Sequence, residues 1–329
     1  MSGLLRKLGF SLVPVVVVGA AAEMGLRSAG WPQVTEAFEH NTPFWVTDPG
    51  LQRKPFPHKE ENTLFRVSSN EDGLRSGPTE RTKQEDTHRI MTLGCSTTFG
   101  WGVADDETYP AQLARLVGEN HDGSVDIVNG GQPGYTSFQG LWLWENTLKD
   151  YQPDVVLLGY VVQDARKAAY SDKSQAVLQR DHRFLKDNVL YNSRAYLALR
   201  SVLGGVQVKA KERPQNGKGG IYRVPPQDYV DNLRAFVEQI QGMGAVPVLF
   251  GFPLERGGYT EEHRKILKAA AVQLGIPHLD LQSKMETASR QAELYFKMDR
   301  GHANAAGNAQ IAEWVYEYLE TEGLLKANL

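Results

Sequence analysis

Apolar residues fall into two kinds of pattern along this chain. Uninterrupted apolar runs predict strands that are buried on both faces, and the clearest run is 155–160. Similar runs predict strands at 90–93, 125–128, 246–250 and 277–281. Between them, apolar residues recur every three or four positions and predict amphipathic helices, which we expect to cover Pro110 onward, 141–148, Pro226 onward, 261–274 and 305–319. Because strands alternate with helices, the pattern predicts an α/β fold, a three-layer sandwich with a central parallel sheet.

The amino-terminal segment, residues 1–29, has a different pattern. Arg6 and Lys7 precede an almost wholly apolar run at 8–22. The run is short for a membrane-spanning helix, which needs about 20 apolar residues. It fits the core of a signal peptide, and 20–22 supplies small residues for cleavage. A membrane anchor that uses residues 4–26 is the alternative. Both interpretations predict an extracytoplasmic protein, either periplasmic or secreted, and the anchor would attach it to the inner membrane.

Two further segments depart from the α/β rhythm. Residues 30–87 are rich in proline and polar side chains, and we interpret them as an irregular lead-in with a short strand at 64–67. Residues 88–329 form the predicted main domain, interrupted at about 165–224 by a segment in which Lys and Arg outnumber Asp and Glu. This basic insertion is either a solvated surface or a surface that attracts an anionic polymer or lipid headgroup.

Composition narrows the class of protein further. The 329 residues are enough for a large core, and the formal net charge of -3 gives no indication of nucleic-acid binding. Cys95 is the only cysteine, so this sequence cannot form an intrachain disulfide. The sequence has no metal-ligand cluster and no cofactor-binding fingerprint, and we expect no cofactor.

The first candidate for chemistry is Ser96, which follows the predicted strand at 90–93 in the sequence Gly94-Cys95-Ser96. In open α/β sheets, ligands bind at the carboxyl ends of the strands, so a hydroxyl at this point is well placed to react. The alternative is structural, because a serine before a helix also serves as its N-cap.

Three other places supply groups that would assist a serine. Asp299 lies three residues before His302, and a carboxylate beside an imidazole fixes its tautomer. Asp299 could instead cap the last helix. The second strand ends in a glycine-rich turn at 129–134, and Gln163 follows the third strand. Backbone N–H groups and a side-chain amide are the components of an oxyanion hole.

At these strand ends the chain resembles the SGNH/GDSL hydrolase family. The matching blocks are 94–96, 129–134, 159–164 and 299–302, in the family's order, and the resemblance extends over about 88–320 without the insertion. It implies a flavodoxin-like fold and an esterase that needs no cofactor. The amino-terminal start of the chain also resembles that of bacterial exported members of the family.

The resemblance implies a role for each site residue. Ser96 would be the nucleophile, His302 the general base and acid, and Asp299 the residue that orients His302. The N–H groups of Ser96 and Gly134 and the side-chain amide of Gln163 would hold the oxyanion. The chain departs from the family at Cys95, where aspartate is usual, and at Gln163, where asparagine is usual.

These observations leave three hypotheses for function. The first is a serine esterase that removes acyl groups from a small molecule, glycan or lipid. The second is an O-acyltransferase that acts on an exported polysaccharide, since a sugar hydroxyl could replace water. The third is a binding module that keeps the fold with impaired catalysis, which the two departures would explain. We interpret Cys95 as a packing residue beneath the turn.

Overall fold

The computed structural model describes residues 2–31, 44–60, 63–75, 79–121, 123–177, 192–199 and 220–325. The chain forms two compact units. One comprises Met1–Pro43 with Ser174–Gly219, and the other comprises Phe44–Lys173 with Gly220–Leu329. The second unit contains the predicted sheet and all the candidate site residues.

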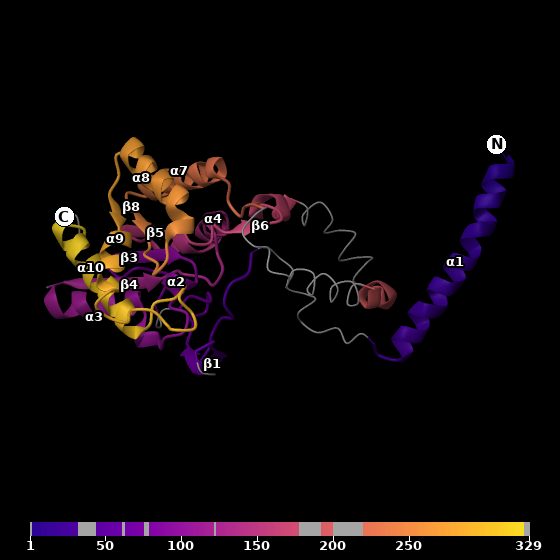
Figure 1. Cartoon of the computed structure of the whole chain (residues 1–329), viewed down its shortest axis with the longest axis horizontal. Helices are drawn as coiled ribbons and strands as arrows, with labels where there is room; N and C mark the ends of the chain where they lie inside the picture. The colour runs from indigo at the N-terminus through magenta and orange to yellow at the C-terminus, as the bar shows by residue number, and fades with distance from the viewer. Residues whose placement is uncertain are drawn as a thin grey trace. The chain divides into compact units, whose positions relative to one another are not determined.

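A five-stranded parallel sheet forms the centre of this unit (Figure 1). Its order is β4-β3-β5-β8-β9. Numbered along the chain, the five strands lie in the order 2-1-3-4-5, which is that of flavodoxin-like folds. The bounds are β3 Thr87–Gly94, β4 Ser124–Asn129, β5 Val155–Gly159, β8 Val246–Gly251 and β9 His278–Asp280. The predicted fold is therefore confirmed. The connections change direction beside β3, so the ligand crevice is expected between the carboxyl ends of β3 and β5.

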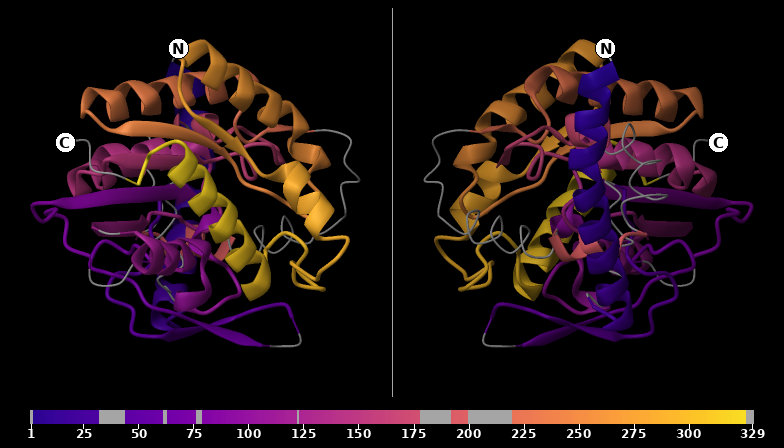
Figure 2. Two further views of the ribbon diagram at one scale, coloured as in Figure 1. Left: turned by 90° about the vertical axis from the view of Figure 1, so that its left-hand side faces the viewer. Right: turned by 90° about the vertical axis from the view of Figure 1, so that its right-hand side faces the viewer.

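Each face of the sheet is covered by its own helices (Figure 2). On β5, Leu157 and Leu158 are both fully buried but point into opposite cores, because side chains alternate along a strand. Leu158 packs toward α4 (Ser137–Asn146), α7 (Pro226–Gly242) and α8 (Glu261–Leu274). Leu157 packs toward α3 (Tyr109–Asn120) and α10 (Ala305–Thr321). The strands are apolar throughout because neither face meets water.

The helices differ from the sequence-based expectations mainly at their ends. Helix α4 begins at Ser137, before the predicted apolar stripe, because Thr136 and Gln139 form a capping box. Two short helices, α2 (Ser96–Phe99) and α9 (Gln282–Ala288), were not expected from the periodicity. Single turns of 3-10 helix occur at Asp105–Glu107, Leu148–Tyr151 and Gly258–Thr260.

Two small antiparallel pairs lie outside the central sheet. In the lead-in, β1 (Lys54–Pro57) pairs with β2 (Leu64–Val67), which confirms the predicted strand. At the base of the insertion, β6 (Lys167–Ala168) pairs with β7 (Ile221–Tyr222). The second pair brings the two ends of the insertion together.

In the first unit, α1 (Ser2–Ser28) contains the apolar run. The Glu23 carboxylate accepts hydrogen bonds from the backbone N–H groups of Arg194 and Ala195, and these bonds lower its pKa to about 2. A helix is predicted around 194–203; residues 194–199 are helical, and the rest lies outside the described residues, as does most of the insertion. Among the described residues, none of the helices has the length and hydropathy needed to cross a membrane.

Candidate active site

Ser96 is the first residue of α2, directly after β3. The N-cap of this helix is Cys95, whose side chain makes no capping hydrogen bond, so Ser96 is not the cap. The Ser96 side chain is nearly buried and its hydroxyl lies 2.8 Å from Nε2 of His302. The first N–H groups of a helix have no intrahelical acceptor, so the Ser96 N–H is available to another group.

His302 lies between Ser96 and Asp299. Its Nδ1 is 2.9 Å from Oδ2 of Asp299, and this hydrogen bond lowers the pKa of Asp299 to about 2. The carboxylate is thus ionised near neutral pH and can only accept, so Nδ1 carries the proton. Nε2 of the neutral ring then has a free lone pair for the hydroxyl of Ser96. The geometry is that of a nucleophile, a base and a residue that orients the base.

The loop that carries Asp299 and His302 is fixed independently of the site. Tyr295 and Ala303 form an isolated antiparallel bridge that closes the loop. Asn304 is the N-cap of α10, and its side chain accepts from the N–H of Gly307. Asp299 therefore does not cap the last helix, which leaves its carboxylate for His302.

The two other predicted oxyanion groups lie on the neighbouring loops. Gly134 has a φ of +79°, a conformation that favours glycine. Its carbonyl accepts from Nη1 of Arg223 at 2.8 Å. Gln163 is 9% exposed, and its Oε1 accepts from the same Nη1 at 3.2 Å. Arg223 therefore links the two loops, a contact that sequence patterns did not indicate.

Cys95 has no access to this crevice. It is 1% exposed and packs in a small apolar cluster with Val161, Val162 and Leu254. Its Sγ lies 3.2 Å from Oγ1 of Thr97. The interpretation of Cys95 as a packing residue is confirmed.

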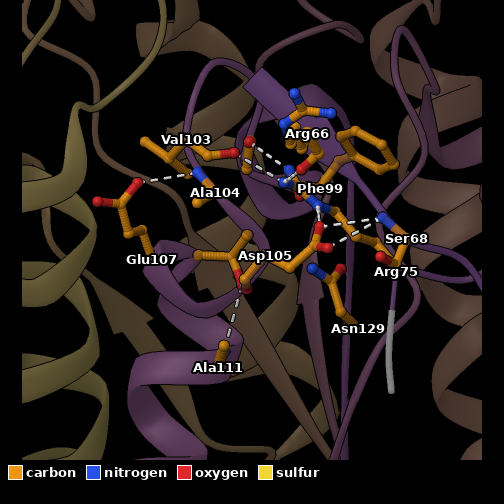
Figure 3. Close-up of polar contacts among 12 residues, drawn as sticks. Arg66, Ser68, Arg75, Phe99, Val103, Ala104, Asp105, Glu107, Ala111 and Asn129 are labelled. Carbon is orange, nitrogen blue, oxygen red and sulfur yellow. Dashed lines mark hydrogen bonds and ion pairs between the residues drawn. The ribbon is translucent and has the colours of Figure 1, made fainter. Parts of the chain in front are cut away.

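The loop that follows α2 is fixed by Arg75 (Figure 3). Arg75 is buried, and its guanidinium donates to the carbonyls of Phe99 and Val103 and to the carboxylate of Asp105. From the second block, Asn129 donates to the carbonyl of Thr98. These contacts hold the carboxyl end of the short helix, so the position of Ser96 depends on residues far away in the sequence.

The lead-in also supplies side chains that sequence analysis did not single out. His58 is buried, and its Nε2 lies 3.4 Å from Oδ2 of Asp299. Trp45 is 40% exposed and donates from Nε1 to the carbonyl of Pro133, in the turn that holds Gly134. Irregular segments show no periodicity, so no pattern in 44–60 pointed to these residues. Within the described parts of the chain, no group of three or more His, Cys, Asp and Glu side chains could hold a metal ion.

Comparison with known families places the chain in one of them. Residues 92–310 match the GDSL-like Lipase/Acylhydrolase family. The match covers well over half of the chain and includes Ser96, Gly134, Gln163, Asp299 and His302. The chain belongs to this family of lipases and esterases. No curated protein matches it significantly.

Several solved structures are similar to this chain at low sequence identity. An alpha/beta hydrolase from the metagenome of Lake Arreo, Spain, is 17% identical and has a TM-score of 0.48, and the match covers 75% of this chain and 99% of that one. The lipase/acylhydrolase from Enterococcus faecalis is 15% identical with a TM-score of 0.49, and the match covers 71% of this chain and 96% of that one. An acetyl-xylooligosaccharide esterase from Geobacillus stearothermophilus is 15% identical with a TM-score of 0.47, and the match covers 73% of this chain and 96% of that one.

Proposed function

We propose that this protein is a serine esterase, a carboxylic ester hydrolase in which Ser96, His302 and Asp299 act as a catalytic triad. The observation that carries the proposal is that the His302 ring lies within hydrogen-bond distance of both Ser96 Oγ and Asp299 Oδ2. A nucleophile, a base and an orienting carboxylate in one line are what activation of a serine requires.

The reaction follows from this order of groups. As Ser96 Oγ attacks the ester carbonyl, Nε2 of His302 takes the hydroxyl proton, and the Asp299 carboxylate stabilises the resulting imidazolium through Nδ1. The tetrahedral oxyanion accepts hydrogen bonds from the N–H groups of Ser96 and Gly134 and from the amide of Gln163. His302 then returns the proton to the departing alcohol, which leaves an acyl group on Ser96. Water attacks the acyl group in the second half, and His302 again moves the proton.

A short-chain aryl ester tests the proposal because its hydrolysis releases a coloured phenol. The full chain should hydrolyse 4-nitrophenyl acetate, and Ser96→Ala should abolish the activity. Cys95→Ala is the matched control, since it removes the neighbouring nucleophilic atom, and it should keep most of the activity. A fluorophosphonate should label the wild type and Cys95→Ala but not Ser96→Ala. Activity that survives Ser96→Ala would refute the assignment.

We propose acyl esters of small molecules, glycans or lipids as the substrate class. If a sugar hydroxyl replaces water in the second half-reaction, the same groups would transfer the acyl chain to the sugar. Measuring free acid and acylated sugar in the presence of an acceptor distinguishes the two. Free acid as the only product supports hydrolysis.

We also propose that the protein works outside the cytoplasm, on the basis of Arg6, Lys7 and the apolar run at 8–22. Fractionation of cells that express the full chain tests this. Recovery of the chain from the cytoplasm alone would contradict it.

A further inference from the structure

Arg223 lies at the base of the insertion, directly after β7, and contacts both loops that carry the predicted oxyanion groups. Its backbone is fixed on both sides, because its N–H donates to the carbonyl of Arg166 and its carbonyl accepts from the N–H of Asp172. The side chain is 19% exposed and forms an ion pair with Asp172, whose side chain is 7% exposed. The pairing of β6 with β7 thus places the largely buried guanidinium of Arg223 beside these two loops.

All five N–H groups of the Arg223 guanidinium have acceptors. Nε and Nη2 donate to the two carboxylate oxygens of Asp172, at 3.0 and 2.7 Å. Nη2 also donates to Oε1 of Gln139 at 3.0 Å, and Nη1 donates to Gly134 and Gln163. A guanidinium has five donors in a rigid planar fork, so this set of contacts permits one orientation of the group.

The contact with Gln163 decides which way its carboxamide faces. Arg223 offers only donors, so the oxygen of the carboxamide must face Arg223 and the NH₂ group must face away. Without such a partner the carboxamide could rotate by half a turn and present its oxygen instead. An oxygen turned toward an oxyanion would repel it, so the orientation of Gln163 determines whether this residue helps or hinders.

The same guanidinium holds the second loop. Its bond to the carbonyl of Gly134 and its bond to Gln139, in the first turn of α4, fix the chain on either side of Thr136. Thr136 itself donates from Oγ1 to Asp172 at 2.8 Å. Arg223 and Asp172 therefore tie the glycine turn to the residue that follows β5.

We propose that Arg223, held by Asp172, is a positioning residue that sets the two oxyanion donors Gly134 and Gln163. The proposal rests on the esterase function proposed above. It also explains how glutamine serves where the family usually has asparagine, because the longer side chain is held at its oxygen. Arg223 fixes the positions of these two residues and acts on the reaction only through them.

A double-mutant cycle between Arg223 and Gln163 tests the proposal. We expect Gln163→Ala to lower kcat on 4-nitrophenyl acetate by about 100-fold, the lower end of the cost of losing a single oxyanion donor. Arg223→Met displaces donors without removing them, so we expect a loss of about 10- to 100-fold. In both variants KM should change less than about threefold. The fold-loss of kcat in the double variant should be much smaller than the product of the two single fold-losses. A structural role for Arg223 would instead give independent, multiplicative losses.

Two further variants are controls, one for unfolding and one for the loss of a positive charge. Arg223→Lys keeps the ion pair with Asp172, so it should fold. Its single ammonium group cannot also reach Gly134 and Gln163, so kcat should fall nearly as far as in Arg223→Met. Arg234→Met removes a partly exposed arginine from α7 and should leave kcat unchanged. Thermal unfolding of each variant identifies those that fold.

A second measurement does not require turnover. In a ¹⁵N–¹H spectrum of the full chain, the side-chain NH₂ pair of Gln163 is assigned by its loss in Gln163→Ala. We expect the pair to shift in Arg223→Lys and not in Arg234→Met. A wild type that is inactive on esters but shows this shift would refute the esterase and keep the positioning of Gln163. Multiplicative losses in an active enzyme, or an unshifted pair, would overturn the proposal.

Discussion

Nε2 of His58 lies 3.4 Å from Oδ2 of Asp299, the oxygen that also accepts from His302. Nδ1 of His58 accepts from the backbone N–H of Glu60, so the ring proton is on Nε2, the nitrogen nearer the carboxylate. Burial lowers the pKa of His58 and favours this neutral form. Asp299 thus has a second imidazole beside it, from the lead-in, besides that of His302.

Replacing His58 should therefore weaken catalysis without abolishing it. We expect His58→Phe to lower kcat by about tenfold, because it removes the polar Nε2–H group that lies 3.4 Å from the Asp299 carboxylate and puts an apolar ring in its place. KM should stay constant because His58 touches no substrate-binding group. His121→Phe, at the end of α3, is the control. An unchanged kcat in His58→Phe would show that the contact has no effect on the triad.

Asp299→Asn should have a far larger effect. The new amide can donate to Nδ1 of His302, which would move the ring proton to Nε2 and leave no acceptor for the hydroxyl of Ser96. We expect kcat to fall by about 10,000-fold, as for the same change in other triads. Steady-state kinetics measures the loss, and thermal unfolding should show a folded protein. Asp106→Asn, at an exposed aspartate, should match the wild type. A loss below about tenfold would contradict the role of Asp299.

Gly134 and Gly275 form a matched pair for testing the glycine turn. Both have positive φ, +79° and +65°, so alanine should cost each about 1–2 kcal/mol of folding free energy. A side chain at Gly275 meets open space, whereas one at Gly134 contacts the Trp45 ring at 3.4 Å. We expect urea unfolding to show similar losses, but only Gly134→Ala should lower kcat, by more than about tenfold. Equal activity of the two variants would argue against a donor at Gly134.

Asp164 predicts a dependence of stability on pH. It is fully buried, and burial raises its pKa from 3.8 to about 6. Below about pH 4 the carboxyl is protonated in both the folded and unfolded states, so it costs nothing. Between about pH 4 and 6 the unfolded chain loses its proton first, and stability falls as pH rises.

Asp164→Asn should remove this cost while keeping the acceptor for the N–H of Ser137. We expect a gain of about 2–3 kcal/mol in the free energy of unfolding at pH 8 relative to pH 4, measured by urea titration. Asp231→Asn, at a half-exposed aspartate, is the control. A gain of equal size at both pH values would contradict the assigned cause.

Arg75 should be essential for stability. Arg75→Met would leave the carbonyls of Phe99 and Val103 without this donor, and the Asp105 carboxylate would keep only the N–H of Ser68. A buried carbonyl left without a donor costs about 1–3 kcal/mol, and Arg75 serves several of them, so we expect a loss of about 3–5 kcal/mol in urea unfolding. Arg115→Met, at an exposed ion pair on α3, should cost less than about 1 kcal/mol. Similar losses in the two variants would contradict the importance of the Arg75 contacts.

The sequence by itself determined the sheet and the position of the reactive groups at its edge. Runs such as 155–160 can only be buried, and a parallel sheet brings the ends of its strands to one side, so Ser96, Gly134 and Gln163 could be assigned to neighbouring loops. Asp299 and His302 are close in the sequence, so their pairing followed from spacing. The family match extends over 92–310, a range that contains all five of these residues.

Only the tertiary structure decided which residues hold these groups in place. Arg223, Arg75 and His58 lie in segments without periodicity, and their partners are far away along the chain. Hydrophobic periodicity reports which face of an element is buried, and it carries no information about the partner of a buried charge. That partner depends on where the chain folds back, so the contacts around Gln163 and Asp299 could be identified only from the folded protein.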